Sequence, residues 1–245
     1  MGNLKARNAS TTLGLLWWVV NPLLMSAVYF FVFGVIFPGT REGEPQFLGY
    51  LISGMFVFTY TSTSMTSGAN SILMNSRLLV NIRFPRLILP MSAILEAGVG
   101  FLVSIPVFFM LAWPVHGIAP GFHIIWFPLA LSLHTMFNLG LAALTARLAV
   151  PFRDINNFIP HLNRLWMYIS PIIWPLAFIE AKEQWVQTAV SLNPLYSYLA
   201  IYRGALMGRA IETGEVVGAV VWALVSLTLG VLAFVRYEGN MIRHL

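Results

Sequence analysis

Long runs of apolar residues, separated by short polar segments, dominate the chain. Six of these runs are close to the roughly 20 residues that an α-helix needs to cross about 30 Å of hydrocarbon. They predict membrane-spanning helices at about 13–37, 47–70, 87–113, 122–148, 156–179 and 216–235. The pattern therefore predicts an all-α integral membrane protein with six transmembrane helices and a single domain over residues 1–245.

The segment 75–90, between the second and third runs, is polar and basic. Arg77, Arg83 and Arg86 accompany Pro85 and an amphipathic turn. The apolar side of such a turn can lie in the membrane interface while its cations face water. The segment is either a docking element for a partner or a basic loop that only fixes the orientation of the chain.

Hydroxyl-bearing side chains fill the middle of the second run, at 59–67. They can bond back to carbonyls of their own helix and permit close helix packing. Alternatively, Tyr60, Ser64 and Ser67, spaced i, i+4 and i+7, share one helix face and line a wet path for a hydroxyl-rich substrate. The sequence leaves both interpretations open.

Glu96 is the only carboxylate within the predicted spans, and an ionisable residue inside a membrane is a candidate functional site. Its depth of about 13 Å, counted at 1.5 Å per residue, matches that of Asn138 on the fourth span, with His134 one turn further out. We expect Glu96 to hydrogen-bond Asn138 or His134 in a structural role, and a proton relay is the alternative.

The fifth run is interrupted by Ser170-Pro171 and by Pro175, which predicts a broken or bent helix. The segment 147–164, in which this run opens, is a second basic surface. The segment that follows, about 180–210, is too polar for a full span, and its aromatic side chains suit interfacial or re-entrant helices. These helices are expected on the extracytoplasmic side, between spans five and six.

Composition supports a membrane protein, because 58% of the residues are hydrophobic and only 9% are charged, against about 25% charged in soluble domains. The formal net charge is +5, but the cations gather at span ends, which argues against a nucleic-acid surface. Their excess in alternate connections predicts that both termini are cytoplasmic. The chain has no cysteine, which excludes disulfides and thiolate metal sites.

Motifs for catalysis are missing from the sequence. There is no GxxxxGK[ST], GxSxG or HExxH, and the five histidines are too scattered to suggest a metal site. We therefore expect neither catalysis nor a cofactor in this chain. Energy for any transport must come from a gradient or from a partner.

Four stretches together resemble the ABC-2 type permeases, the transmembrane subunits of exporters of O-antigen, teichoic acid, capsule and galactan. The matching positions are Lys5, Arg7, Leu13, Gly14, Trp17 and Pro22; Phe84, Pro85, Arg86 and Pro90; Arg153, Asp154, Ser170 and Pro171; and Leu192, Asn193, Pro194, Tyr202 and Arg203. The resemblance covers about residues 4–237. Family members usually carry an amphipathic interfacial helix before the Lys-x-Arg motif, and this chain begins almost at that motif.

The resemblance implies a homodimer in the bacterial inner (plasma) membrane, with two copies of a separate ATP-binding cassette subunit that binds ATP and Mg. The complex would export a lipid-linked polysaccharide from the cytoplasm. Coupling to the ATPase would involve a cytoplasmic coupling helix with Arg77, Arg83, Phe84, Pro85 and Arg86. A second cytoplasmic contact would be Arg153 and Asp154. The candidate residues of the substrate path are Tyr29, Phe33, Tyr60, Ser64, Ser67, Trp166, Tyr168 and Trp174.

Other functions stay open at this stage. An ABC-2 exporter of a small molecule or drug would share these features. A proton-coupled secondary transporter would use Glu96. A membrane-embedded glycosyl or acyl transferase is a third alternative, with Asp154 as its candidate acid.

Overall fold

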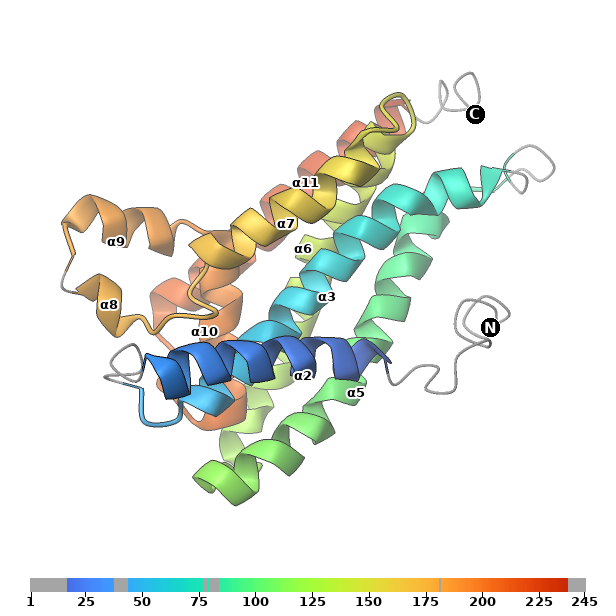
Figure 1. The fold of residues 1–245 in the computed structure, drawn as a ribbon. Coiled ribbons are helices and arrows are strands. Elements are labelled where there is room, and N and C mark those ends of the chain that lie inside the picture. Colours follow the sequence, from blue (N-terminus) through green and yellow to red (C-terminus); the bar gives the residue numbers. More distant parts are fainter. Residues whose placement is uncertain (1–16, 38–43, 77–78, 80–83, 181, 238–245) are drawn as a thin grey trace.

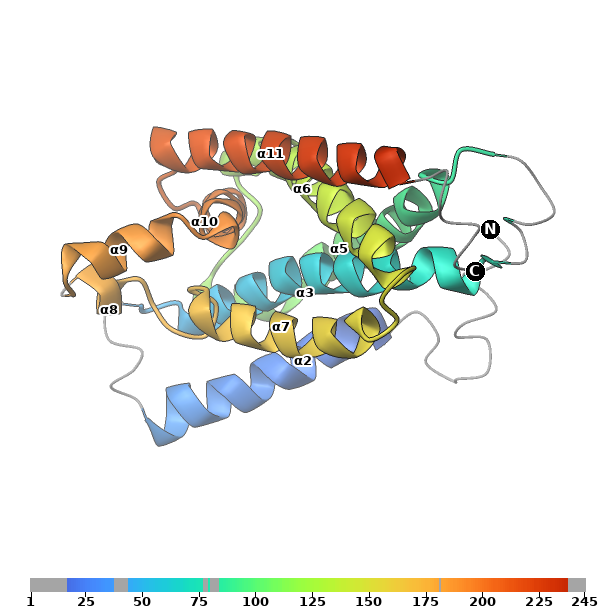
Figure 2. The ribbon, with the colours of Figure 1, turned by 90° about the horizontal axis from the view of Figure 1, so that it is seen from above.

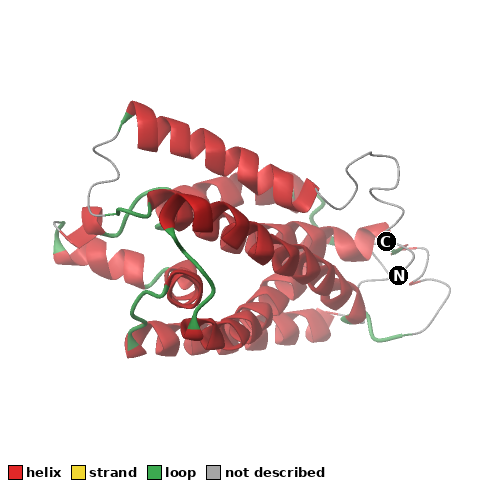
Figure 3. Cartoon of the chain, turned by 90° about the horizontal axis from the view of Figure 1, so that it is seen from below, coloured by secondary structure: helices red, strands yellow, loops and turns green. Residues whose placement is uncertain are grey.

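The computed structural model describes residues 17–37, 44–76, 79, 84–180 and 182–237. Within these ranges every regular element is a helix, as Figure 3 shows. The elements are α2 (Trp17–Tyr29), the π-helix η2 (Phe30–Ile36), α3 (Phe47–Met74), α5 (Ile88–His116), the 3₁₀-helix η4 (Phe122–Ile125), α6 (Trp126–Ala149), α7 (Ile155–Ile169), α8 (Ala177–Glu180), α9 (Gln184–Ser191), α10 (Pro194–Met207) and α11 (Thr213–Tyr237). The all-α prediction is confirmed for this part of the chain.

Four helical stretches among the described residues are long and apolar enough to cross a membrane: Val19–Ile36, Ile88–His116, Phe122–Ala149 and Thr213–Tyr237. They correspond to the first, third, fourth and sixth predicted spans. α3 is 28 residues long but is not one of the four, because its many serines and threonines lower its mean hydropathy.

The predicted break in the fifth run, 156–179, is confirmed. α7 ends at Ile169, and Ser170 takes an extended conformation with ψ 148°. Pro171 follows directly and has no amide hydrogen to continue the helix. The chain returns to a helix only at Ala177, in the four-residue α8.

α3 forms the centre of the molecule and packs against α2, α5, α6, α7 and α10. Figures 1 and 2 show these helices around it. α6 and α11 approach each other unusually closely, because a Cβ on Gly140 would lie 2.1 Å from the Ser226 carbonyl and one on Gly230 would lie 2.0 Å from the Gly140 carbonyl oxygen. Glycines allow this close packing of helix backbones.

The two ends of the molecule differ. The ends of α3, α6 and α11 and the starts of α5 and α7 gather at one end, on the right in Figure 1, whereas α8 and α9 lie at the other. α10 lies across the bundle and is viewed almost end on in Figure 2. It begins at Pro194, and the side chain of the preceding Asn193 caps it by accepting a hydrogen bond from the Leu195 backbone amide, as is common at helix starts.

Candidate functional site: an aromatic surface beside a buried arginine

Four of the candidate substrate-path residues come together between α2–η2 and the end of α7, where Tyr168 is exposed and the other three are partly buried. The Tyr29 and Phe33 rings stack with centroids 6.3 Å apart, and the Tyr29 hydroxyl donates to the Tyr168 hydroxyl at 3.3 Å. The Trp174 indole donates to the Tyr168 carbonyl oxygen at 2.9 Å. We call these four residues, Tyr29, Phe33, Tyr168 and Trp174, the aromatic surface.

The break after α7 positions half of the aromatic surface. The Ser170 hydroxyl donates to the Trp166 carbonyl at 2.7 Å and accepts from the Asn193 amide at 2.8 Å. The Trp166 indole donates to the Asn193 side-chain oxygen at 2.9 Å. Asn193 therefore connects the end of α7 to the start of α10 by hydrogen bonds. Trp174 lies in the non-helical segment that follows α7.

Tyr60 and Ser64 are buried and lie apart from the aromatic surface. Tyr60 lines a separate cavity of about 100 Å³ together with Asn21, Thr59 and Phe101, and its place on a substrate path stays a prediction. The Tyr60 ring stacks on Phe101 at 5.2 Å, and its hydroxyl is 2.9 Å from the Thr135 hydroxyl. α3 is surrounded by other helices, so the face that carries these hydroxyls packs inside the protein. Ser67 is only partly buried.

Trp166 is partly buried, and its hydrogen bond to Asn193 places it in the packing between α7 and α10 rather than on the aromatic surface. Of the eight path residues, the structure thus groups four on one surface.

The predicted contact of Glu96 with Asn138 or His134 is wrong. His134 is fully buried and its Nε2 lies 2.7 Å from the Thr61 hydroxyl instead. In the described part of the chain no hydrogen bond joins Glu96 to either residue. The reason is the helix turn of about 100° per residue, since Glu96 precedes the buried Ala97 and is rotated away from the buried face of α5.

Of the predicted coupling residues, Arg77 and Arg83 lie outside the described residues. Phe84 is partly buried and packs against a cluster that contains Ile72 of α3, Leu89 of α5 and Phe234 of α11. Pro85 is exposed and Arg86 is partly buried. Phe84 therefore packs against the apolar cluster that joins the ends of these helices.

The second predicted cytoplasmic contact, Arg153 and Asp154, is exposed. Both residues lie in a turn. The Asn156 backbone amide donates to the Arg153 carbonyl oxygen at 3.2 Å, and the Asn157 backbone amide donates to the Asp154 carbonyl oxygen at 3.0 Å. This turn leads into α7 at the same end of the molecule as the start of α5 (Figure 1).

A buried arginine next to the aromatic surface was not predicted. Arg203 is only 3% exposed, and its Nη2 donates to the carbonyl oxygens of Pro171 at 2.8 Å and Tyr50 at 3.3 Å. Its guanidinium carbon lies 3.3 Å from the centre of the Tyr50 ring. Burial lowers the pKa of Arg203, and the neighbouring Tyr50 opposes this shift.

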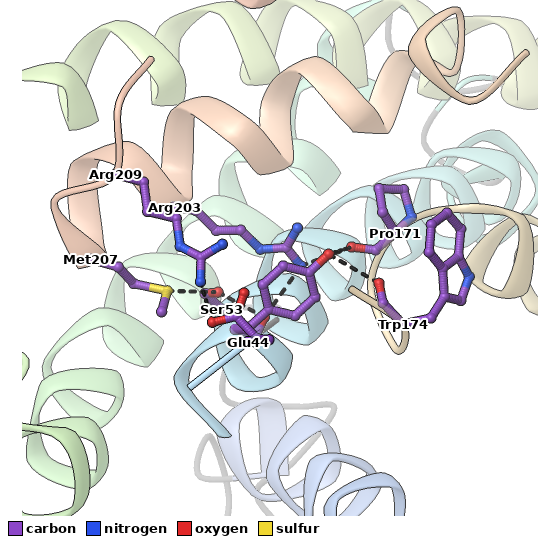
Figure 4. A network of polar contacts seen from close by, with 8 residues as sticks. Glu44, Ser53, Pro171, Trp174, Arg203, Met207 and Arg209 are labelled. Carbon is purple, nitrogen blue, oxygen red and sulfur yellow. Dashed lines mark hydrogen bonds and ion pairs between the residues drawn. The ribbon is translucent and has the colours of Figure 1, made fainter. Parts of the chain in front are cut away.

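Tyr50 connects this arginine to the aromatic surface. Its hydroxyl hydrogen is shared between the carbonyl oxygens of Pro171 at 2.9 Å and Trp174 at 3.0 Å. Figure 4 shows Arg203 directed toward Pro171, with Trp174 beyond it and the Arg209–Glu44 ion pair nearby. We call Tyr50, Pro171 and Arg203 the arginine clamp, because together they hold the segment after α7 against α3 and α10.

In the sequence, Arg203 was noted only as a position of the family resemblance within the segment 180–210. The available signal was its setting, since Tyr198–Met207 is otherwise apolar or aromatic apart from one glycine, and a cation in such a stretch needs partners when it is buried. The partners are backbone carbonyls, which no sequence motif identifies.

Comparisons with known proteins cover both the aromatic surface and the clamp. Residues 1–207 match the family described as ABC-2 type transporter. The O-antigen export system permease protein RfbA of Myxococcus xanthus is 30% identical over 212 residues, which are 86% of this chain and 80% of the relative. A protein of the same name from Klebsiella pneumoniae is 31% identical over 211 residues, or 86% of this chain and 79% of the relative.

Proposed function

The chain belongs to the ABC-2 type transporter family, and from this premise we propose that it is the permease subunit of an ABC exporter of lipid-linked polysaccharide. The observation that carries the proposal is the similarity to O-antigen export permeases over 86% of the chain. ATP and Mg would be bound by a separate ATPase subunit, because the sequence has no phosphate-binding loop of its own.

The proposed topology has six spans in the inner membrane, with both termini in the cytoplasm. The connection from α3 to α5 and the connection from α6 to α7 lie at the same end of the molecule (Figure 1). Both contain a basic segment, and this supports a cytoplasmic location for that end. α3 would span the bilayer shielded by the helices around it. α8, α9 and α10 would form the extracytoplasmic re-entrant region.

Coupling would occur through the connection between α3 and α5, in a complex of two permease and two ATPase subunits. Arg86, with Arg77 and Arg83, would dock on the ATPase, and Phe84 would transmit the motion. The packing of Phe84 against the cluster that contains residues of α3, α5 and α11 supports this role, because closely packed side chains transmit a displacement to their neighbours. Arg153 and Asp154 would make a second contact.

The aromatic surface would face the polymer near the axis of a homodimer. Rings of Tyr, Trp and Phe offer sugars a flat, weakly binding face, and many shallow sites allow a chain both to enter and to leave. The exposure of Tyr168, at 47%, is consistent with such a surface.

The test is export by the complex with its ATPase partner in cells that lack the native permease. We expect ATP-dependent appearance of polymer at the cell surface, a strong decrease for Trp174→Ala, and no change for Trp185→Ala. Trp185 is a matched control because it is 69% exposed and outside the aromatic surface. Transport by the purified permease without its ATPase would contradict the proposal.

A further inference from the structure

A cavity of about 380 Å³ lies between α8, α9 and the first turn of α10, at the end of the molecule opposite the start of α5. Its volume falls in the range of about 300–1,000 Å³ that is usual for small-ligand sites. The polar side chains that line it are neutral: Gln184, Gln187, Thr188, Ser191 and Tyr196. Leu176, Ile179 and Val190 supply its apolar wall. We call this cavity the exit pocket.

The hydroxyl groups of α9 are oriented as acceptors. The Thr188 hydroxyl donates to the Gln184 carbonyl at 2.9 Å, and the Ser191 hydroxyl donates to the Thr188 carbonyl at 2.9 Å. Because each hydrogen is used within the helix, the oxygen lone pairs remain for a ligand that donates. Sugar hydroxyl groups are such donors.

Tyr196 supplies a donor on the facing helix. Burial raises the pKa of Tyr196, and the charges of Glu215 and Glu212 raise it further. Its hydroxyl therefore stays protonated at physiological pH and can donate to a sugar oxygen. No side chain that lines the pocket is charged, so a phosphate or carboxylate group would be placed there without a counter-ion.

We propose that the exit pocket binds a neutral sugar unit of the polymer on the extracytoplasmic side. The inference rests on the proposed function, since the pocket meets the polymer only if this protein carries the polymer outward. Leu176 follows Trp174 by two residues, so the pocket continues from the aromatic surface along the chain. A neutral pocket with one tyrosine binds weakly enough for the polymer to move on.

The experiment measures direct binding to the purified permease–ATPase complex in lipid nanodiscs, which contain no sugar detergent. The probes are maltohexaose, mannohexaose and the acidic hexagalacturonate, followed by saturation-transfer NMR. We expect at least one neutral hexasaccharide to bind and the acidic one to bind at least tenfold more weakly. Tyr196→Phe and Thr188→Val, which keep the shapes of the side chains, should each weaken neutral binding about fivefold, the usual effect of one hydrogen bond.

Gln184→Ala tests the pocket a third time, with Gln46→Ala as its control, because Gln46 precedes α3 and does not line the pocket. The variants must unfold at the wild-type temperature and retain the ATPase. Absence of neutral binding, equal binding of hexagalacturonate, or wild-type binding by all three pocket variants would overturn the inference. Polymer export by the wild type is scored separately, so loss of the pocket and loss of the proposed function give different results.

Discussion

Replacement of Arg203 tests whether the arginine clamp depends on a guanidinium rather than on any positive charge. Arg203 contacts carbonyls on two elements, Tyr50 of α3 and Pro171 after α7, and its guanidinium carbon lies over the Tyr50 ring. Arg203→Met removes the charge and the donors but keeps much of the aliphatic volume. Arg203→Lys keeps the charge but loses the planar fork.

Opposing contributions set the change in the free energy of unfolding for Arg203→Met. Hydrogen bonds from charged donors contribute about 1.5–3 kcal/mol each, and a desolvated cation–π contact adds about 2 kcal/mol. The methionine variant loses these contacts but also the desolvation penalty of a buried cation, which is several kcal/mol. The Pro171 carbonyl keeps its bond from the Tyr50 hydroxyl. We expect a net loss of about 2 kcal/mol for Arg203→Met.

Arg203→Lys should lose at least as much, about 3 kcal/mol, because an ammonium is more strongly hydrated than a guanidinium and cannot stack on the ring. The assay is thermal unfolding of the complex in nanodiscs. At about 2–4 °C per kcal/mol for a chain of this size, the midpoint should fall by about 4–8 °C for methionine and further for lysine. Lys182→Met, at an exposed cation of the same end, should leave it unchanged.

The refuting result is an Arg203→Lys variant that unfolds at the wild-type temperature, because any cation would then suffice. A methionine variant more stable than the wild type would show that desolvation outweighs the contacts. A local readout separates the clamp from general destabilisation. The chain has no cysteine, so a single cysteine at Leu176 reports the opening of the segment after α7, and its labelling should accelerate in both variants.

Three further outcomes are expected. Gly140→Ala places a methyl group 2.1 Å from the backbone of α11 and should lower the free energy of unfolding by about 1–3 kcal/mol, measured by thermal unfolding. Gly214→Ala, with no atom within 4 Å, should leave it unchanged. Equal effects of the two substitutions would contradict the close packing. Phe84→Ala should leave the ATPase bound in co-purification but reduce polymer-stimulated ATP hydrolysis, and unchanged stimulation would remove Phe84 from the coupling route. Glu96→Gln should leave export unchanged between pH 6 and pH 8, since no described contact depends on its charge; a loss of export that varies with pH would instead favour proton coupling.

Local chemistry predicted much of the fold. The apolar runs located four long helices within a few residues, and the Ser170-Pro171 pair marked the break, because proline cannot continue the hydrogen-bond ladder. The second half of the fifth run is not helical before Ala177, as its prolines predicted. Its apolar residues, such as Ile172 and Ile173, are buried inside the protein without being helical.

The site depended on tertiary contacts that spacing does not reveal. Tyr29 meets Tyr168 across 139 positions, and Arg203 meets Tyr50 across 153. Aromatic type alone selected Tyr60 as readily as Tyr168, although one is buried and the other exposed. What separates them is the central place of α3, which follows from the helices around it and not from its own sequence.

That central place has a consequence for how the protein is made. A helix leaves the insertion machinery for lipid by itself only when its own side chains are sufficiently apolar. α3 carries the hydroxyls of 59–67 and buries most of its residues against other helices. If α3 spans the bilayer as proposed, we expect it to enter the lipid only together with α5 and α6, which cover it, so that its insertion would be shared with later parts of the chain.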